Sequence, residues 1–221
     1  SRFTVVAIDL PGHGFTQSPP TSQLSLPGMA DALHELLRTL DVQPDLVIGH
    51  SAGAAILARM CIDAAIAPRE LVCINGALLP FRGVPGLFFS PVAKMIASTS
   101  LVPRLLAWRA SDRTATERLI RSTGSTIEPA GIEFYARLMR TSGHVAATLG
   151  MMAQWDLEAL LRDLRTLPTP ITLMVGSNDL TVSPTEAQRV RTILPDAKII
   201  TLRGLGHLAH EERPVEIFSL V

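Results

Sequence analysis

One short segment, residues 48–53, constrains the fold of this chain more than any other. It reads I-G-H-S-A-G, ends the apolar run 45–48 and opens into the apolar segment 54–60. This order predicts a strand, a tight turn and a helix, with Ser51 at the apex of a G-x-S-x-G pattern. A serine on such a turn adopts a strained backbone that lifts its hydroxyl clear of the sheet. We expect glycine at 49 and 53 to relieve a clash that a Cβ atom would create.

Five-residue patterns with two glycines also occur by chance in many proteins, so the flanking strand and helix supply the specificity. If Ser51 is a nucleophile, the helix that begins at Ala52 directs its first backbone N–H groups at the place where negative charge would develop. The sequence therefore predicts Ala52 as one donor of an oxyanion hole.

Composition excludes several classes of protein. Hydrophobic residues make up 47% and charged residues 18% of 221 residues, which excludes a disordered chain. Lys+Arg and Asp+Glu are equal at 20 each, so no global field favours nucleic acid. Cys61 and Cys73 fall in a predicted helix and a predicted strand and are interpreted as small buried residues. We expect a cytoplasmic protein, because we find no signal peptide and no apolar run of the roughly 18 residues that a membrane span requires.

Short apolar runs alternate with segments of helical periodicity along most of the chain. This alternation predicts a mostly parallel sheet with helices on both faces. The predicted strands lie at 4–9, 45–48, 71–74, 171–175 and 197–202. Capping side chains and first-turn prolines predict helices that begin at Ser25, at Thr114 (with Glu117), at Ser183 (with Pro184 and Glu186) and at Pro214.

The rhythm changes between residues 80 and 167, where strands vanish and the segment looks helical. Because this segment lies between two predicted strands, we interpret it as an inserted lid. The expected organisation is a core formed by 1–79 and 168–221 and a helical lid formed by 80–167.

Two further strand ends carry polar groups that would complete the chemistry of Ser51. Asp179 follows the 171–175 strand and His207 follows the 197–202 strand, and functional groups gather at this edge of a parallel sheet. His207 would take the proton of Ser51, and Asp179 would orient the imidazole and stabilise its charged form. A lone Asp after a strand is usually a turn residue and a lone His is usually structural, but the three lie in the order expected of a triad.

A metal site is the alternative for the histidine-rich end of the chain. His207, His210, Glu211 and Glu212 could hold a metal ion, but the triad already uses His207. We therefore predict no metal and no cofactor.

The motifs at 9–14, 49–53, 176–179 and 204–207 together resemble the α/β-hydrolase superfamily. A closer likeness, in segments 75–81, 142–147, 151–157 and 206–212, is to the magnesium-chelatase accessory hydrolases of bacteriochlorophyll biosynthesis. The resemblance implies an α/β-hydrolase fold with a helical lid. It also implies a small-molecule substrate such as a tetrapyrrole and an association with magnesium chelatase.

The front of the chain departs from the superfamily. Such folds begin with three strands before the equivalent of 4–9, and a loop among them supplies the second oxyanion-hole donor. Here the chain has no initiator Met and enters the 4–9 strand almost at once. We expect residues upstream, because two central strands would otherwise expose unpaired backbone.

Several residues are candidates for a substrate pocket, and each has an ordinary structural alternative. His50 could shape the pocket floor or simply pack. Asn75 stands where some relatives carry the triad acid, and as an amide it supports Asp179 in that role. The remaining candidates are His144, Met151 and Trp155, which could form a polar contact and an adaptable apolar wall.

The lid has a local charge excess that favours an anionic ligand, partner or membrane surface, although a solvated helical face is the simpler interpretation. Segment 86–91 could line the pocket mouth or touch a membrane, and packing against the core is the safer expectation. The charged residues are Arg82, Lys94, Arg104, Arg109, Arg113, Arg118, Arg121, Arg137 and Arg140 against Asp112, Glu117, Glu128 and Glu133.

Two functions of different classes follow. The first is a serine hydrolase that acts on an ester or similar acyl bond of a bulky apolar substrate under the lid. The second is a non-catalytic accessory or tetrapyrrole-binding protein that has kept the triad. Presence of all three triad residues favours chemistry, while another reaction on the same scaffold, such as carbon–carbon bond hydrolysis, stays open.

Overall fold

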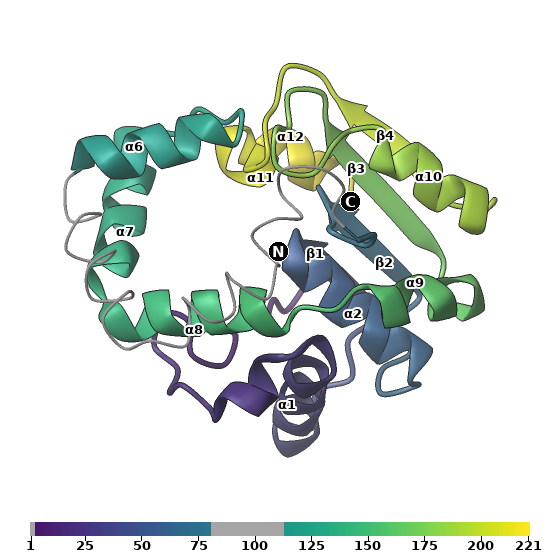
Figure 1. The fold of residues 1–221 in the computed structure, drawn as a ribbon. Coiled ribbons are helices and arrows are strands. Elements are labelled where there is room, and N and C mark those ends of the chain that lie inside the picture. The colour runs from purple at the N-terminus through teal and green to yellow at the C-terminus, as the bar shows by residue number, and fades with distance from the viewer. Residues whose placement is uncertain (1–2, 81–112) are drawn as a thin grey trace.

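A parallel sheet forms the centre of the computed structural model, which describes residues 3–80 and 113–221. In these ranges the strands lie in the order β1-β2-β3-β4, and every neighbouring pair is parallel (Figure 1). Their carboxyl ends therefore meet at one edge of the sheet. The strands are β1 (Leu46–His50), β2 (Glu70–Ile74), β3 (Ile171–Gly176) and β4 (Lys198–Leu202).

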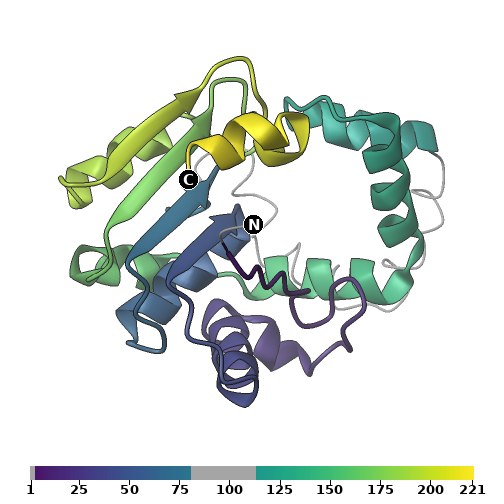
Figure 2. The ribbon, with the colours of Figure 1, turned by 180° about the vertical axis from the view of Figure 1, so that it is seen from behind.

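Helices cover both faces of the sheet. In Figure 1, α2 (Ala52–Ile62) and α10 (Glu186–Ile193) lie in front of the strands, and α1 (Leu26–Thr39) packs against α2. Figure 2, from behind, shows α12 (Pro214–Ser219) across the opposite face, preceded by the short α11 (Ala209–Glu212).

Alternation along the strands divides the core between these two faces. On β2, Leu71 and Cys73 belong to the large core under α1, α2 and α10, whereas Val72 and Ile74 belong to a smaller core with Leu205, Ala209 and Ile217. Successive side chains of a strand point to opposite faces, and each face is buried here. An apolar run without polar breaks is therefore what a parallel strand covered on both sides requires.

The described residues between β2 and β3 are helical. Figure 1 shows α6, α7 and α8 in an arc that extends away from the sheet. Near its ends, α8 lies beside the short 3-10 helix η1 (Thr21–Leu24), and the α6–α7 turn lies beside the loops that follow β3 and β4. The helices are α6 (Arg113–Ser122), α7 (Pro129–Arg140), α8 (Ser142–Gln154), α9 (Glu158–Asp163) and the 3-10 helix η2 (Leu164–Thr166). The division into core and lid stays a prediction.

Four of the five predicted strands and two of the predicted helix starts are confirmed. Ser25 caps α1, since its Oγ accepts a hydrogen bond from the N–H of Gly28 at 3.3 Å, and α12 begins at Pro214.

The two other helix starts are wrong in position. Thr114 lies inside α6, and Glu117 pairs with Arg121 at 2.8 Å. Ser183 closes a turn with the N–H of Glu186, and α10 begins only at Glu186.

The strand predicted at 4–9 is also absent. Residues 4–9 form no strand, and Val5 is 82% exposed. A strand exists only through hydrogen bonds to a neighbour. Among the described residues β1 pairs with β2 alone, so the backbone groups on its other edge have no strand partner, and the side chain of Ile48 in this strand is 39% exposed.

The predicted charge excess of the lid lies partly within the described residues. Segment 86–91 and the residues Arg82, Lys94, Arg104, Arg109 and Asp112 lie outside the described residues. Among the described lid residues, two of the basic side chains form ion pairs: Arg140 with Glu133 at 3.5 Å and Arg121 with Glu117 at 2.8 Å. In 3–80 and 113–221 we find no helix whose length and apolar content would suit a membrane crossing.

Candidate active site

Ser51 stands on a sharp turn between β1 and α2. β1 ends at His50 and α2 begins at Ala52, so one residue makes the reversal. Its backbone has φ 50° and ψ −118°, a region that a residue with a Cβ atom rarely occupies. Contacts to the β2 side hold it there, since its N–H donates to Ile74 O at 3.2 Å and its carbonyl accepts from Ala77 N–H at 3.0 Å. Strain held in this way is typical of functional turns.

Only one of the two elbow glycines is required sterically. A Cβ atom on Gly49 would lie 2.6 Å from Cα and N of Ala54, a backbone contact that cannot yield cheaply. Among residues 3–80 and 113–221, a Cβ atom on Gly53 would meet nothing within 4 Å. The expectation that both glycines relieve a clash is therefore wrong for Gly53, whose side-chain position faces open space.

Ala52 is the first residue of α2, where backbone N–H groups have no acceptor within the helix. Such a donor is available to a negative ligand atom. Its role in an oxyanion hole stays a prediction.

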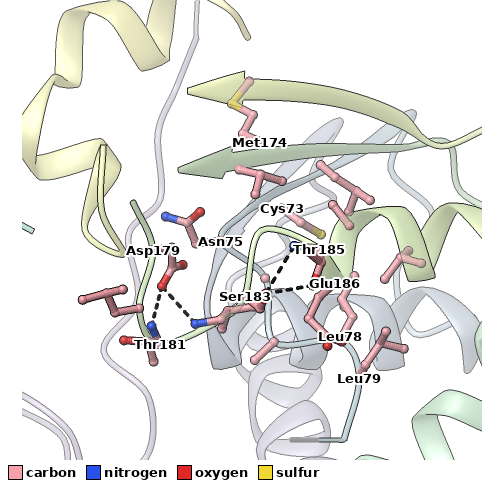
Figure 3. A pocket seen from close by; sticks show the side chains of 18 of the residues that line it. Cys73, Asn75, Leu78, Leu79, Met174, Asp179, Thr181, Ser183, Thr185 and Glu186 are labelled. Carbon is pink, nitrogen blue, oxygen red and sulfur yellow. Dashed lines mark hydrogen bonds between the residues drawn. The ribbon is translucent and has the colours of Figure 1, made fainter. Parts of the chain in front are cut away.

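Asp179 is buried in the turn after β3, and its carboxylate makes three hydrogen bonds. Its Oδ1 accepts from the N–H groups of Thr181 at 2.7 Å and Val182 at 2.9 Å, and Oδ2 contacts His207 Nδ1 at 2.8 Å (Figure 3 shows the first two). The backbone of its own loop thus fixes one oxygen and leaves the other for the histidine.

The contact with Asp179 assigns the ring nitrogens of His207. Nδ1 carries the hydrogen that Asp179 accepts, which leaves Nε2 as the basic nitrogen of the neutral ring. The ring is buried and lies against His50, with centroids 4.7 Å apart. Within the described residues Ser51 Oγ has no hydrogen bond to this ring, so the structure joins acid to base directly and brings the serine to the same sheet edge.

His50, the residue before the serine, holds the main chain of His207. Its Nε2 lies 2.8 Å from the carbonyl oxygen of His207 and must donate, because a carbonyl only accepts. Burial, then the neighbouring His210 and His207, lowers the pKa of His50 from 6.5 to about 3. A neutral His50 with hydrogen on Nε2 is the consistent form at neutral pH.

Asn75 also supports the His207 loop. It follows β2 with φ 47° and is 2% exposed. Its Nδ2 donates to the carbonyls of Gly206 at 2.9 Å and His207 at 2.8 Å, while its Oδ1 accepts from Gly176 N–H at 2.7 Å. Both ends of the amide are therefore engaged by the protein.

The other pocket candidates lie along and just after α8, away from Asp179. His144 packs edge-to-face on His13 at 5.3 Å, and its Nδ1 accepts from Gly14 N–H at 3.4 Å. Burial, then His13, lowers the pKa of His144, while Asp9 acts in the opposite direction. Met151 packs half-buried against the large core, and Trp155 is buried within it.

A cavity of about 450 Å³ lies beside Asp179, between the loop after β2 and the start of α10 (Figure 3). Asn75 and Asp179 line one end. The rest of the wall is mixed, with apolar side chains such as Leu78, Leu79 and Val190 and polar ones at Thr181, Ser183, Thr185 and Glu186. Of the five pocket candidates only Asn75 contributes to its wall; Ser51 and His207 do not.

The two carboxylates considered for a metal site, Glu211 and Glu212, accept hydrogen bonds from other groups of the protein. Glu211 accepts from the hydroxyl of Tyr135 at 2.5 Å, and Glu212 accepts from Gly206 N–H at 2.8 Å. Across 3–80 and 113–221 no group of three His, Cys, Asp or Glu residues is arranged to hold a metal ion.

Sequence reasoning missed the turn between α6 and α7, residues 123–126. This turn contacts the loop that carries Asp179 and the loop that carries His207. The carbonyl of Thr123 accepts from the N–H groups of Leu180 at 3.2 Å and His207 at 3.3 Å. Ser125 Oγ accepts from Leu208 N–H at 2.8 Å. Its only local signal is Gly124, which ends α6 with φ 83°, and nothing in that signal points to a histidine over 80 residues away.

Comparison with known proteins agrees with this architecture. The family model described as "Alpha/beta hydrolase family" matches residues 1–220. The magnesium-chelatase 30 kDa subunit of Rhodobacter capsulatus is 37% identical over 96% of this chain and 73% of that protein. The sn-1-specific diacylglycerol lipase ABHD11 of Mus musculus is 24% identical over 98% of this chain and 70% of that protein.

A solved structure of an α/β-hydrolase fold protein from Burkholderia ambifaria superposes with a TM-score of 0.76 at 20% identity. The match covers 96% of this chain and 77% of that one. At this identity the likeness concerns the fold. Together with the full-length match to the family model, it establishes that the chain belongs to the alpha/beta hydrolase family.

Proposed function

We propose that this protein is a serine hydrolase that cleaves an ester or similar acyl bond of a bulky apolar substrate. One observation carries the proposal: a buried Asp179–His207 hydrogen bond of 2.8 Å lies at the strand ends next to the strained turn of Ser51. No simple structural need explains a strained serine beside a paired histidine, whereas nucleophilic catalysis needs both.

In the proposed reaction Ser51 Oγ attacks the substrate carbonyl carbon while His207 Nε2 takes the serine proton. The carbonyl oxygen becomes an oxyanion, which the N–H of Ala52 helps to stabilise. His207 then gives the proton to the leaving oxygen, and an acyl-serine remains. Water, deprotonated by the same nitrogen, releases the acid and restores Ser51.

Asp179 keeps the imidazole in the useful tautomer and stabilises its charged form. Two backbone N–H groups already hold its Oδ1, so the carboxylate has little freedom to turn away. The missing contact between Ser51 and His207 fits this role, because such hydrogen bonds are often formed only when substrate is bound.

The helical segment 80–167 is proposed as the lid over this site, and the cavity behind Asp179 as space for an apolar part of the substrate. The proposed substrate class is a tetrapyrrole ester from bacteriochlorophyll biosynthesis. It rests on the family resemblance of segments 75–81, 142–147, 151–157 and 206–212, and the 37% identity to a magnesium-chelatase subunit supports that resemblance. Under this proposal His144 and Met151 on α8 belong to the lid side of the site, while Trp155 packs in the large core.

A second candidate is an accessory role in a chelatase assembly without hydrolysis. The name of that relative, a magnesium-chelatase subunit, favours it. In this case the Asp179–His207 pair would be structural, and the protein would bind chelatase or its porphyrin substrate.

A fluorophosphonate probe separates the two candidates, because it reacts with an activated serine. We expect the full-length protein to be labelled and the Ser51→Ala variant to remain unlabelled. Arylester hydrolysis should follow the same pattern. An unlabelled wild type, in the presence of a serine hydrolase that labels normally in the same tube, would argue for the accessory role. Pigment synthesis in cells that carry Ser51→Ala then links the chemistry to the pathway.

A further inference from the structure

The main chain around His207 is held from opposite sides by residues remote in the sequence. On one side the carbonyl of His207 accepts from Asn75 Nδ2 and from His50 Nε2, both at 2.8 Å. On the other side its N–H donates to Thr123 O at 3.3 Å, and the next N–H, of Leu208, donates to Ser125 Oγ at 2.8 Å. Both peptide groups that flank the imidazole are therefore bonded to other segments.

The two sides belong to different parts of the fold. Asn75 directly follows β2, and His50 is the last residue of β1. Both therefore lie at the carboxyl-end edge of the sheet. Thr123 and Ser125 belong to the α6–α7 turn of the inserted helices. The same Thr123 carbonyl accepts from Leu180 N–H in the loop of Asp179, so this turn ties the acid loop to the histidine loop.

Close backbone contact makes this turn a fitted part of the site. Gly124 packs against the carbonyl of Asn178, and Gly206, directly before His207, packs against Gly124. A side chain at either glycine would separate the turn from the two loops. Ser125 is 1% exposed, so solvent does not reach its hydroxyl. Loss of this hydroxyl would leave the buried N–H of Leu208 without an acceptor.

We propose that Asn75 and Ser125 are positioning residues for the general base. They fix the peptide groups on the two sides of the His207 Cα, and through them the direction in which Nε2 points. The inserted helical segment is then a structural part of the catalytic centre, and its 123–126 turn stays in place while substrate enters. This inference rests on the proposed function for its kinetic consequences, but the geometry of His207 is measurable without a substrate.

Two substitutions remove one support each with little change in shape. Ser125→Ala deletes the acceptor of Leu208 N–H. Asn75→Asp keeps the oxygen that accepts from Gly176 N–H, and aspartate also tolerates the positive φ of this position. The substitution replaces the donating amide nitrogen by a carboxylate oxygen, which then faces the carbonyl oxygens of Gly206 and His207. Ser122→Ala is the matched control, because Ser122 is exposed and its Oγ bonds only within α6, to Leu119 O at 2.6 Å.

We expect Ser125→Ala and Asn75→Asp each to lower kcat for an arylester about 10- to 100-fold, the range for a misplaced catalytic group, with KM changed less than about threefold. Fluorophosphonate labelling should slow in parallel. The low-field proton resonance of His207 Nδ1–H, which reports its bond to Asp179, should shift or broaden. Ser122→Ala should match wild type in all three readouts.

Kinetics and a resonance identical to wild type in both variants would overturn the inference. If the wild type neither labels nor hydrolyses, the proposed function fails, while a resonance that moves in the two variants but not in Ser122→Ala still supports positioning. Amide hydrogen exchange of the wild type covers the case of poor folding: slow exchange at His207 and Leu208 is expected, and fast exchange at both would contradict the proposal.

Discussion

Ser51 and His207 reach the same edge of the sheet by different means. Ser51 is placed mainly by its immediate neighbours, β1 before it and α2 after it, and by two backbone hydrogen bonds, to Ile74 at the end of β2 and to Ala77 just beyond it. His207 is placed by residues from four remote segments: His50, Asn75, Thr123 with Ser125, and Asp179. The nucleophile is a local structure, whereas the base is a product of tertiary contacts.

The difference predicts how each group fails. A local turn fails when its own backbone geometry is blocked, and a change there should act on folding stability. A residue held by remote contacts can lose its alignment while the fold survives, and a change there should act on kcat. Substitutions at Asp179, at the elbow glycines and at His50 test this difference.

Replacement of the acid should have the largest effect, on the base alone. In Asp179→Asn the remaining oxygen keeps its bonds to Thr181 and Val182, so the new amide N–H faces His207 Nδ1 and forces the hydrogen onto Nε2. We expect kcat to fall about 10⁴-fold, as in triads with the wrong tautomer, with a normal Tm. Asp31→Asn, at an exposed position on α1, is the control. A loss below tenfold would remove Asp179 from the mechanism.

The elbow glycines test the nucleophile side. Gly49→Ala places Cβ 2.6 Å from the backbone of Ala54 and should lower the free energy of unfolding by about 3 kcal/mol. Gly53→Ala adds a methyl group to open space within α2 and should raise it by about 0.5–1 kcal/mol through helix propensity. Urea denaturation measures both. Equal losses from the two variants would mean that the motif is constrained as a whole.

The pH dependence of stability tests His50, which belongs to both sides. Its pKa of about 3 in the fold lies below the ordinary 6.5, so between these values the unfolded chain binds the extra proton. Its contribution is complete above pH 6.5 and is lost as pH falls toward 3. From pH 6.5 to 5 the wild type should lose at most about 2 kcal/mol more than His50→Gln, which can still donate to His207. Parallel pH profiles in urea denaturation would show that His50 is not kept neutral by the fold.

Much of the fold could be predicted from the sequence because short apolar runs and helix-capping residues depend only on neighbouring residues. The apolar runs 45–48, 71–74, 171–175 and 197–202 correspond to β1 to β4, and Ser25 caps α1 as predicted. The failures are places where a local pattern met a tertiary constraint. Residues 4–9 have the composition of a strand but form no ladder with another strand, and Thr114 has a capping pattern but sits inside a helix.

Within the candidate site, the sequence identified residue types but not their contacts. Asn75 was singled out as a pocket residue, and the structure uses both ends of its amide to support the His207 loop. Trp155 was expected in an apolar wall and is buried in the large core. The contributions of Thr123 and Ser125 left no trace in the sequence, because a backbone carbonyl and one hydroxyl in a turn carry no pattern.

By itself the sequence determined the parallel αβ order, the turn that carries Ser51 and the strand ends that carry Asp179 and His207. These depend on periodicity, capping and glycine, which act over a few residues. The contact of Asp179 Oδ2 with His207 Nδ1, and the bonds of both their loops to the 123–126 turn, depend on tertiary packing and could not be predicted from the sequence. Such contacts form when distant segments pack at one sheet edge, and their geometry is set by that packing rather than by any residue's own preference.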